Sequence, residues 1–269
     1  MCAMTIVRSF ILPPLKVGHS MGAATASLVA GTLEQSQAAV SWRGTLPKAG
    51  TGTGEPPSGG TEPRLETTEL RGAPALQIPR VSTCVMIDGI GSISRDDAHA
   101  ASTFATHVMG TANVAARAAE LGPKTYPHLD AAVAARLAAV AKHPATPLGP
   151  QFISQEAAQA ILGRGSTEVP GAGGRVALVH DPKVLCTFPV YLTPAMNYSF
   201  LDAMADIPAL LLEPTQGWPF PPAENARLKG RLNNLTTARI AGGHHCHADP
   251  ASAPQTADAV IGFLRRSVS

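Results

Sequence analysis

A serine lies between two glycines near the start of the chain, in Gly18-His19-Ser20-Met21-Gly22. An extended piece ending in Val17 precedes it, and small residues from Ala23 to about Leu33 follow and are predicted to be helical. Glycines two positions either side of a serine relieve crowding at a tight, strained strand-to-helix turn. This motif therefore predicts a serine hydroxyl exposed above a sheet, with a plain glycine–serine turn as the alternative.

The later part of the chain alternates between strand and helix patterns. Two apolar runs end in an acid, as buried parallel strands often do: Thr83 to Asp88 and Pro208 to Glu213. Leu235 to Ile240 is predicted to be a third strand. A last helix is expected to begin at Ser252, which would form a capping box with Gln255. This order indicates an α/β fold with a parallel sheet.

A helical region interrupts that alternation between about 93 and 165, and we expect it to form a lid. The expected helices are Asp96 to Met109, Asn113 to Leu121, Asp130 to Lys142 and Gln155 to Leu162, the last capped by Ser154. Residues 34–77 are rich in glycine and proline and lack hydrophobic periodicity. The predicted organisation is a strand and elbow helix (1–33), a disordered low-complexity insertion (34–77) and an α/β domain with the lid (78–269).

Composition narrows the class of partner. The 269 residues are 45% hydrophobic and carry a net charge of +2 with no basic stripe, so a nucleic-acid partner is not expected. No apolar run approaches the roughly 20 residues needed to span a bilayer, and no signal peptide is recognised. The four cysteines show no CxxC spacing, which favours a reducing, cytoplasmic location over a disulfide framework.

The histidine-rich loop Gly242-Gly243-His244-His245-Cys246-His247 follows the third predicted strand. Its place after the serine suits a serine–histidine–acid triad with His244 as the base. Three histidines and a cysteine could instead bind zinc, but no second ligand cluster accompanies them, so no metal is predicted. Two residues remain candidates for the acid, Asp88 first and then Glu213. The Met21 N–H is the predicted oxyanion donor.

The segments VGHSMG, LLLEPTQG and GGHHCH together resemble the α/β-hydrolase superfamily. Within it, Leu162 to Val169 followed by His180 to Lys183 is similar to the serine hydrolase-like proteins. The resemblance covers about 17–33 and 81–265. It implies a parallel sheet with a helical lid, Ser20 as nucleophile, His244 as its base and no cofactor.

The chain departs from that superfamily at its start, where only seventeen residues precede Gly18. We therefore expect an incomplete, N-terminally truncated sheet that lacks the loop carrying the second oxyanion donor. Two functions follow. The first is a serine hydrolase of carboxylic esters or thioesters, with small-molecule substrates. The alternative is a catalytically impaired or inactive fragment that acts as a binding module.

Overall fold

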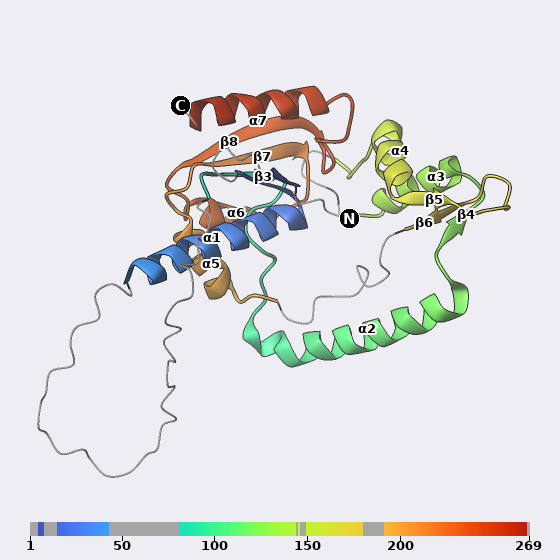
Figure 1. Ribbon diagram of the computed structural model, residues 1–269, viewed down its shortest axis with the longest axis horizontal. Helices are drawn as coiled ribbons and strands as arrows, with labels where there is room; N and C mark the ends of the chain where they lie inside the picture. Colours follow the sequence, from blue (N-terminus) through green and yellow to red (C-terminus); the bar gives the residue numbers. More distant parts are fainter. Residues whose placement is uncertain are drawn as a thin grey trace, which may run out of the picture.

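A computed structural model describes residues 5–7, 15–42, 81–143, 145, 149–179 and 191–267. In this part of the chain a five-stranded sheet runs through the centre (Figure 1), in the order β1-β2-β3-β7-β8. Its strands are β1 (Thr5–Val7), β2 (Leu15–His19), β3 (Thr83–Ile87), β7 (Ala209–Gln216) and β8 (Leu235–Gly243). The last four are mutually parallel, and β1 pairs antiparallel with β2 at the edge. The sheet is partial and open.

Helices cover both faces of this sheet. Below it in Figure 1 lie α1 (Met21–Trp42), α5 (Pro194–Ala203) and α6 (Pro222–Lys229), and above it lies α7 (Ala253–Ser267). Alternate strand residues face opposite layers, as a pleated strand requires. Met86 packs with Ala26 of α1, whereas Val85 packs with Phe263 of α7. The predicted parallel α/β fold is therefore confirmed.

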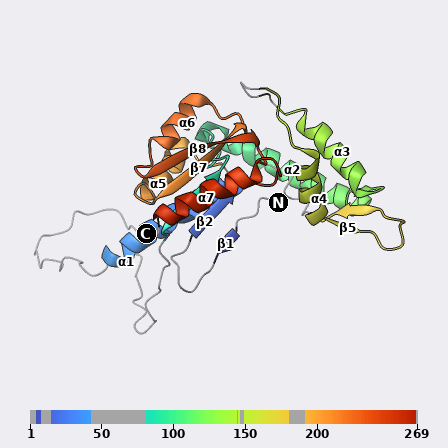
Figure 2. The same ribbon diagram turned by 90° about the horizontal axis from the view of Figure 1, so that it is seen from above.

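The region that the sequence predicts to form a lid, named the lid region here, lies partly to one side of the main sheet (Figures 1 and 2) and partly below it in Figure 1. It contains the short 3-10 helix η1 (Asp97–His99), the helices α2 (Ala100–Leu121), α3 (Leu129–Val140) and α4 (Gln155–Arg164), and a small antiparallel sheet ordered β4-β6-β5. These strands are β4 (Thr125–Tyr126), β5 (Ser166–Glu168) and β6 (Val176–Leu178). Val133, Ile153 and Ala157 belong to a separate apolar cluster of this region.

Some local predictions are confirmed and others are wrong. Ser154 caps α4, because its hydroxyl accepts the Ala157 N–H at 3.0 Å. The two helices expected between Asp96 and Leu121 are one, α2, since Gly110 stays helical. The expected capping box at α7 does not form: the Ser252 N–H donates to Asp249, and the Gln255 side chain accepts the N–H of Ala241 instead.

The first helix is longer than the sequence predicts. It runs to Trp42 rather than ending near Leu33, so residues 34–42 of the predicted insertion are helical. Ala26 and Ala30, in the predicted part of this helix, are buried against the sheet. The rest of the predicted insertion, 43–77, lies outside the described residues. Among the described helices, none combines the length and apolar character needed to cross a bilayer.

Candidate active site

The ends of the four parallel strands bring the predicted residues to one edge of the sheet. Ser20 follows β2, Asp88 follows β3, and His244 follows β8. The register aligns these ends, because His19 pairs with Ile87 and Gly243 pairs with Gln216. Loops at the carboxyl edge of a parallel sheet are where such folds bind ligands.

Ser20 occupies a strained turn between β2 and α1. Its φ is 54°, in the left-handed region that non-glycine residues rarely adopt. The Ser20 N–H donates to the Ile87 carbonyl at 2.9 Å, which ties the turn to the end of β3. Its own carbonyl accepts the Ala23 N–H at 2.9 Å and so begins the helix. Met21 is the first residue of α1, at the helix N-terminus. The local geometry is thus the strand–turn–helix that the glycine spacing predicts.

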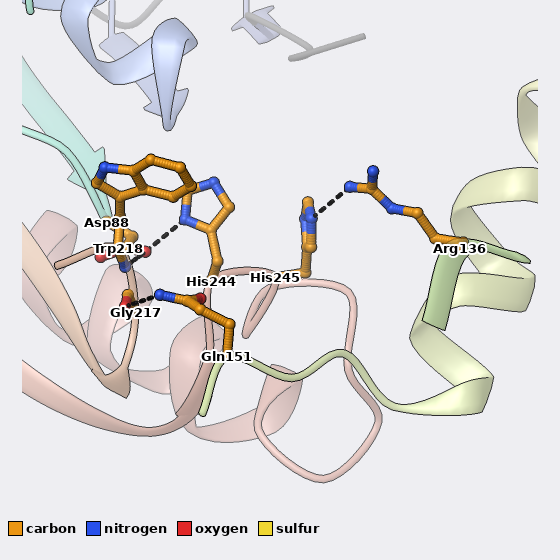
Figure 3. Close-up of polar contacts among 7 residues, drawn as sticks. All are labelled: Asp88, Arg136, Gln151, Gly217, Trp218, His244 and His245. Carbon is orange, nitrogen blue, oxygen red and sulfur yellow. Dashed lines mark hydrogen bonds and ion pairs between the residues drawn. The ribbon is translucent and has the colours of Figure 1, made fainter. Parts of the chain in front are cut away.

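Asp88 and His244 form a direct hydrogen bond between Oδ2 and Nδ1 (Figure 3). Both side chains are largely buried, 7% and 17% exposed respectively. The Trp218 N–H donates to the same carboxylate oxygen at 2.8 Å. Because Asp88 accepts from Nδ1–H, the neutral ring has its unprotonated nitrogen at Nε2, the atom able to take a proton.

The carboxyl group of Asp88 lies against Gly217 in the loop after β7. A Cβ added at Gly217 would come within 2.7 Å of Asp88 Cγ, so only glycine fits without displacement. Asp88 itself has a φ of 49°, a second strained position at this edge. Two strained residues held by neighbouring packing are typical of functional sites.

Glu213, the second candidate for the acid, lies elsewhere. It forms an ion pair with Lys229 of α6 at 2.5 Å and accepts from the Asn225 side chain at 3.3 Å. The structure therefore brings Asp88, and not Glu213, to His244.

The two other histidines of the loop are held neutral. Burial, followed by the nearby charges of His244 and Arg136, lowers the pKa of His245 to about 3. Its Nε2 lies 3.3 Å from the Arg136 guanidinium, which can only donate, so Nε2 accepts and the proton is on Nδ1. Burial also lowers the pKa of His247, and it raises the pKa of the Cys246 thiol to about 11.

A metal site is absent from the described residues, which contain no group of three or more His, Cys, Asp or Glu arranged to hold an ion. The described part of the histidine loop therefore shows no arrangement of side chains that would hold zinc.

Two contributors to the site, Trp218 and Gln151, carry no sequence signal that points to them. The Trp218 indole lies between two imidazoles, with its ring centroid 6.0 Å from that of His244 and 5.6 Å from that of His143. Gln151, which precedes α4, donates to the Gly217 carbonyl at 2.8 Å. A backbone N–H donor or a lone glutamine in a loop forms no motif, so only the fold identifies them.

Comparison with known proteins gives matches by structure alone. No protein-family profile matches the chain, and no curated protein matches its sequence. Among solved structures, the hypothetical protein PA1622 from Pseudomonas aeruginosa PAO1 is 22% identical with a TM-score of 0.65, over 94% of this chain and 68% of that one. The thioesterase domain from the curacin biosynthetic pathway is 14% identical with a TM-score of 0.51, over 92% of this chain and 65% of that one.

The topology and these matches agree with one another. The chain has an α/β-hydrolase fold. This is the fold that the resemblance predicts, and the predicted fold class is confirmed. The finer likeness to serine hydrolase-like proteins stays a prediction, and its segment His180 to Lys183 lies outside the described residues. The chain spans about two thirds of the length of these two structures.

Proposed function

We propose that this protein is a serine hydrolase of carboxylic esters or thioesters. The observation that carries the proposal is the buried hydrogen bond between Asp88 and His244 at the sheet edge where the Ser20 turn also ends. A carboxylate, an imidazole and a hydroxyl in this chain order are the components of a catalytic triad, which is recognised by geometry and roles.

In the proposed reaction the Ser20 Oγ attacks the acyl carbon while Nε2 of His244 takes the hydroxyl proton. Collapse of the tetrahedral intermediate breaks the bond to the leaving group, which receives that proton. Water, activated by the same imidazole, then hydrolyses the acyl-enzyme and regenerates the hydroxyl. Asp88 holds the ring in one tautomer and stabilises the imidazolium in both steps.

The Met21 N–H at the start of α1 is the proposed oxyanion donor. A helix N-terminus presents N–H groups and a partial positive charge to developing negative charge. One such donor contributes about 10²–10³ in rate in serine hydrolases. No cofactor or metal has a role in this chemistry.

The half-exposed Trp218 indole beside His244 favours small-molecule substrates with an apolar portion. It is 40% exposed, and it offers an aromatic surface next to the proposed base. Desolvated aromatic walls with a few polar groups are usual in ligand sites of enzymes.

A fluorophosphonate probe, which reacts covalently with activated serines, tests the proposal. We expect labelling of the wild-type chain, its loss in Ser20→Ala, and its retention in Ser199→Ala, a control at an exposed serine of α5. Circular dichroism establishes that each variant is folded. A folded wild-type chain that takes up no label would refute the hydrolase and favour the inactive binding module.

A further inference from the structure

The lid region reaches the acid–base pair through one buried amide side chain. Gln151 lies between α3 and α4 and is 5% exposed, and its Nε2 donates to the Gly217 carbonyl at 2.8 Å. That carbonyl shares a peptide unit with the Trp218 N–H, which donates to Asp88 Oδ2 at 2.8 Å. The carbonyl and N–H of a trans peptide point in opposite directions. This single peptide is therefore held from both sides (Figure 3).

We propose that Gln151 is a positioning residue that acts on His244 through this peptide and Asp88. The inference rests on the proposed function. The bonds run in one direction: the Gln151 amide donates to the peptide carbonyl, the peptide N–H donates to Asp88, and Asp88 accepts from His244. Hydrogen bonds in such a chain polarise one another in a low-dielectric interior, so each link strengthens the next.

Packing makes the carboxylate sensitive to the tilt of this peptide. The Gly217 Cα lies directly against the Asp88 carboxyl group, since even a methyl group there would be 2.7 Å from Cγ. A rotation of the Gly217–Trp218 peptide plane would therefore move the Trp218 N–H that donates to Asp88 and also Gly217, against which the carboxylate packs. Gln151 opposes that rotation from the side away from Asp88.

A second glutamine provides a matched control. Gln216, the residue before Gly217, donates from its side chain to the Pro150 carbonyl at 3.2 Å. The two glutamines thus join the same two segments in reciprocal directions. Only Gln151 binds the peptide unit that donates to Asp88, whereas Gln216 binds a carbonyl of the lid segment.

The experiment compares Gln151→Met and Gln216→Met in the full chain. Methionine matches glutamine in length and cannot donate. The readouts are kcat and KM for 4-nitrophenyl acetate, the second-order rate constant of fluorophosphonate labelling, and the midpoint of thermal unfolding. We expect Gln151→Met to lower kcat and the labelling rate by about tenfold or more with KM nearly unchanged, because small misplacements of catalytic groups are costly. Gln216→Met should stay within about twofold of wild type.

A third variant, Gln151→Glu, separates hydrogen bonding from packing. A protonated carboxyl group donates to the Gly217 carbonyl, but an ionised one cannot. Burial at this position, which is 5% exposed, should raise the pKa of the introduced carboxyl group above the ordinary value of about 4.3. The ratio of its labelling rate to that of the wild type should therefore rise as the pH is lowered from about 8 to about 5. Because the readout is the change of this ratio with pH, it tests the proposal even if Gln151→Met fails to fold.

Three results would overturn the proposal: equal rates for Gln151→Met and wild type, equal losses for the two methionine variants, or a pH-independent ratio for Gln151→Glu. Each leaves the proposed hydrolase intact, because wild-type labelling continues. An unlabelled wild-type chain instead refutes the hydrolase, and the positioning role falls with it.

Discussion

Replacing Gly217 by alanine should disable the proposed acid–base pair while the chain remains folded. The added Cβ would lie 2.7 Å from both Cγ and Oδ2 of Asp88. Non-bonded carbon atoms approach each other to about 3.5 Å at their optimum, so the carboxyl group or the loop must move by roughly 1 Å. Asp88 cannot simply rotate away, because the Trp218 N–H and His244 both hold Oδ2.

The consequences for rate and for stability differ in size. A displacement of about 1 Å in a catalytic group can cost about 10²-fold in rate. Extra volume in a packed site costs about 1–3 kcal/mol of the free energy of unfolding, against a usual total of about 5–15 kcal/mol. We therefore expect Gly217→Ala to fold and to react with a fluorophosphonate roughly 100-fold more slowly than the wild type.

Labelling time courses at fixed probe concentration, combined with urea unfolding, measure both effects. Gly110→Ala in α2 is the control, because a Cβ at that position meets no atom within 4 Å. It should leave the labelling rate unchanged and stabilise the helix slightly. If Gly217→Ala labels as fast as the wild type, the carboxylate against Gly217 does not serve Ser20, and the reasoning from Asp88 fails.

The two candidate acids should differ on substitution. Asp88→Asn should lower the labelling rate by about 10⁴, as the same change of the triad acid does elsewhere. Glu213→Gln should leave the labelling rate unchanged and cost under about 1 kcal/mol of the free energy of unfolding in urea. A loss of labelling in Glu213→Gln alone would reverse the assignment. Lowering the pH should destabilise the fold through His245, because burial lowers the pKa of this residue from its ordinary 6.5 to about 3. Between pH 6.5 and about 3 the unfolded chain binds a proton at His245 that the folded chain does not. The free energy of unfolding is therefore unaffected by His245 above pH 6.5 and decreases as the pH falls below it, by at most about 1.4 kcal/mol per pH unit. His245→Gln should flatten this part of the pH dependence of urea unfolding, and an unchanged slope would show that His245 titrates normally. Asn197→Ala should destabilise the chain by about 2 kcal/mol or more, because the buried amide pairs with both the N–H and the carbonyl of Ser92; guanidinium unfolding that matches the wild type would contradict this.

The elements of the sheet were predictable because their causes are local. The run from Thr83 to Ile87 is apolar after Thr83, as is typical of a strand buried on both faces, and it is β3, which is buried at every position. Ser154 caps α4 as predicted, since its hydroxyl needs only the N–H groups of the next turn. The capping box at Ser252 failed because Gln255 instead accepts the N–H of Ala241, fourteen residues away, in β8.

The extent of two helices differs from the sequence prediction. α1 continues to Trp42 even though its composition predicted an end near Leu33. Two short helices merged into α2, because one glycine in a long helix weakens it without ending it.

For the candidate site, the sequence by itself determined which groups arrive at the sheet edge. Glycine spacing specifies the turn at Ser20, and strand patterns that end in Asp88 and before His244 place those residues at strand ends. Each of these signals lies within a few neighbouring residues, which is the range over which backbone geometry is set.

Only the tertiary structure decided which of those groups meet. The Asp88–His244 bond joins residues 156 positions apart, and the Trp218 N–H reaches Asp88 across 130 positions. Glu213 was the second candidate by pattern, but its side chain pairs with Lys229 of α6. Side-chain direction and strand order resolve that choice, and both depend on how distant segments pack. The turn at Ser20, which constrains the fold most, is therefore specified by local sequence. The pairing of Asp88 with His244 and with the Trp218 N–H, and the contact of Gln151, depend on the assembled sheet and lid region.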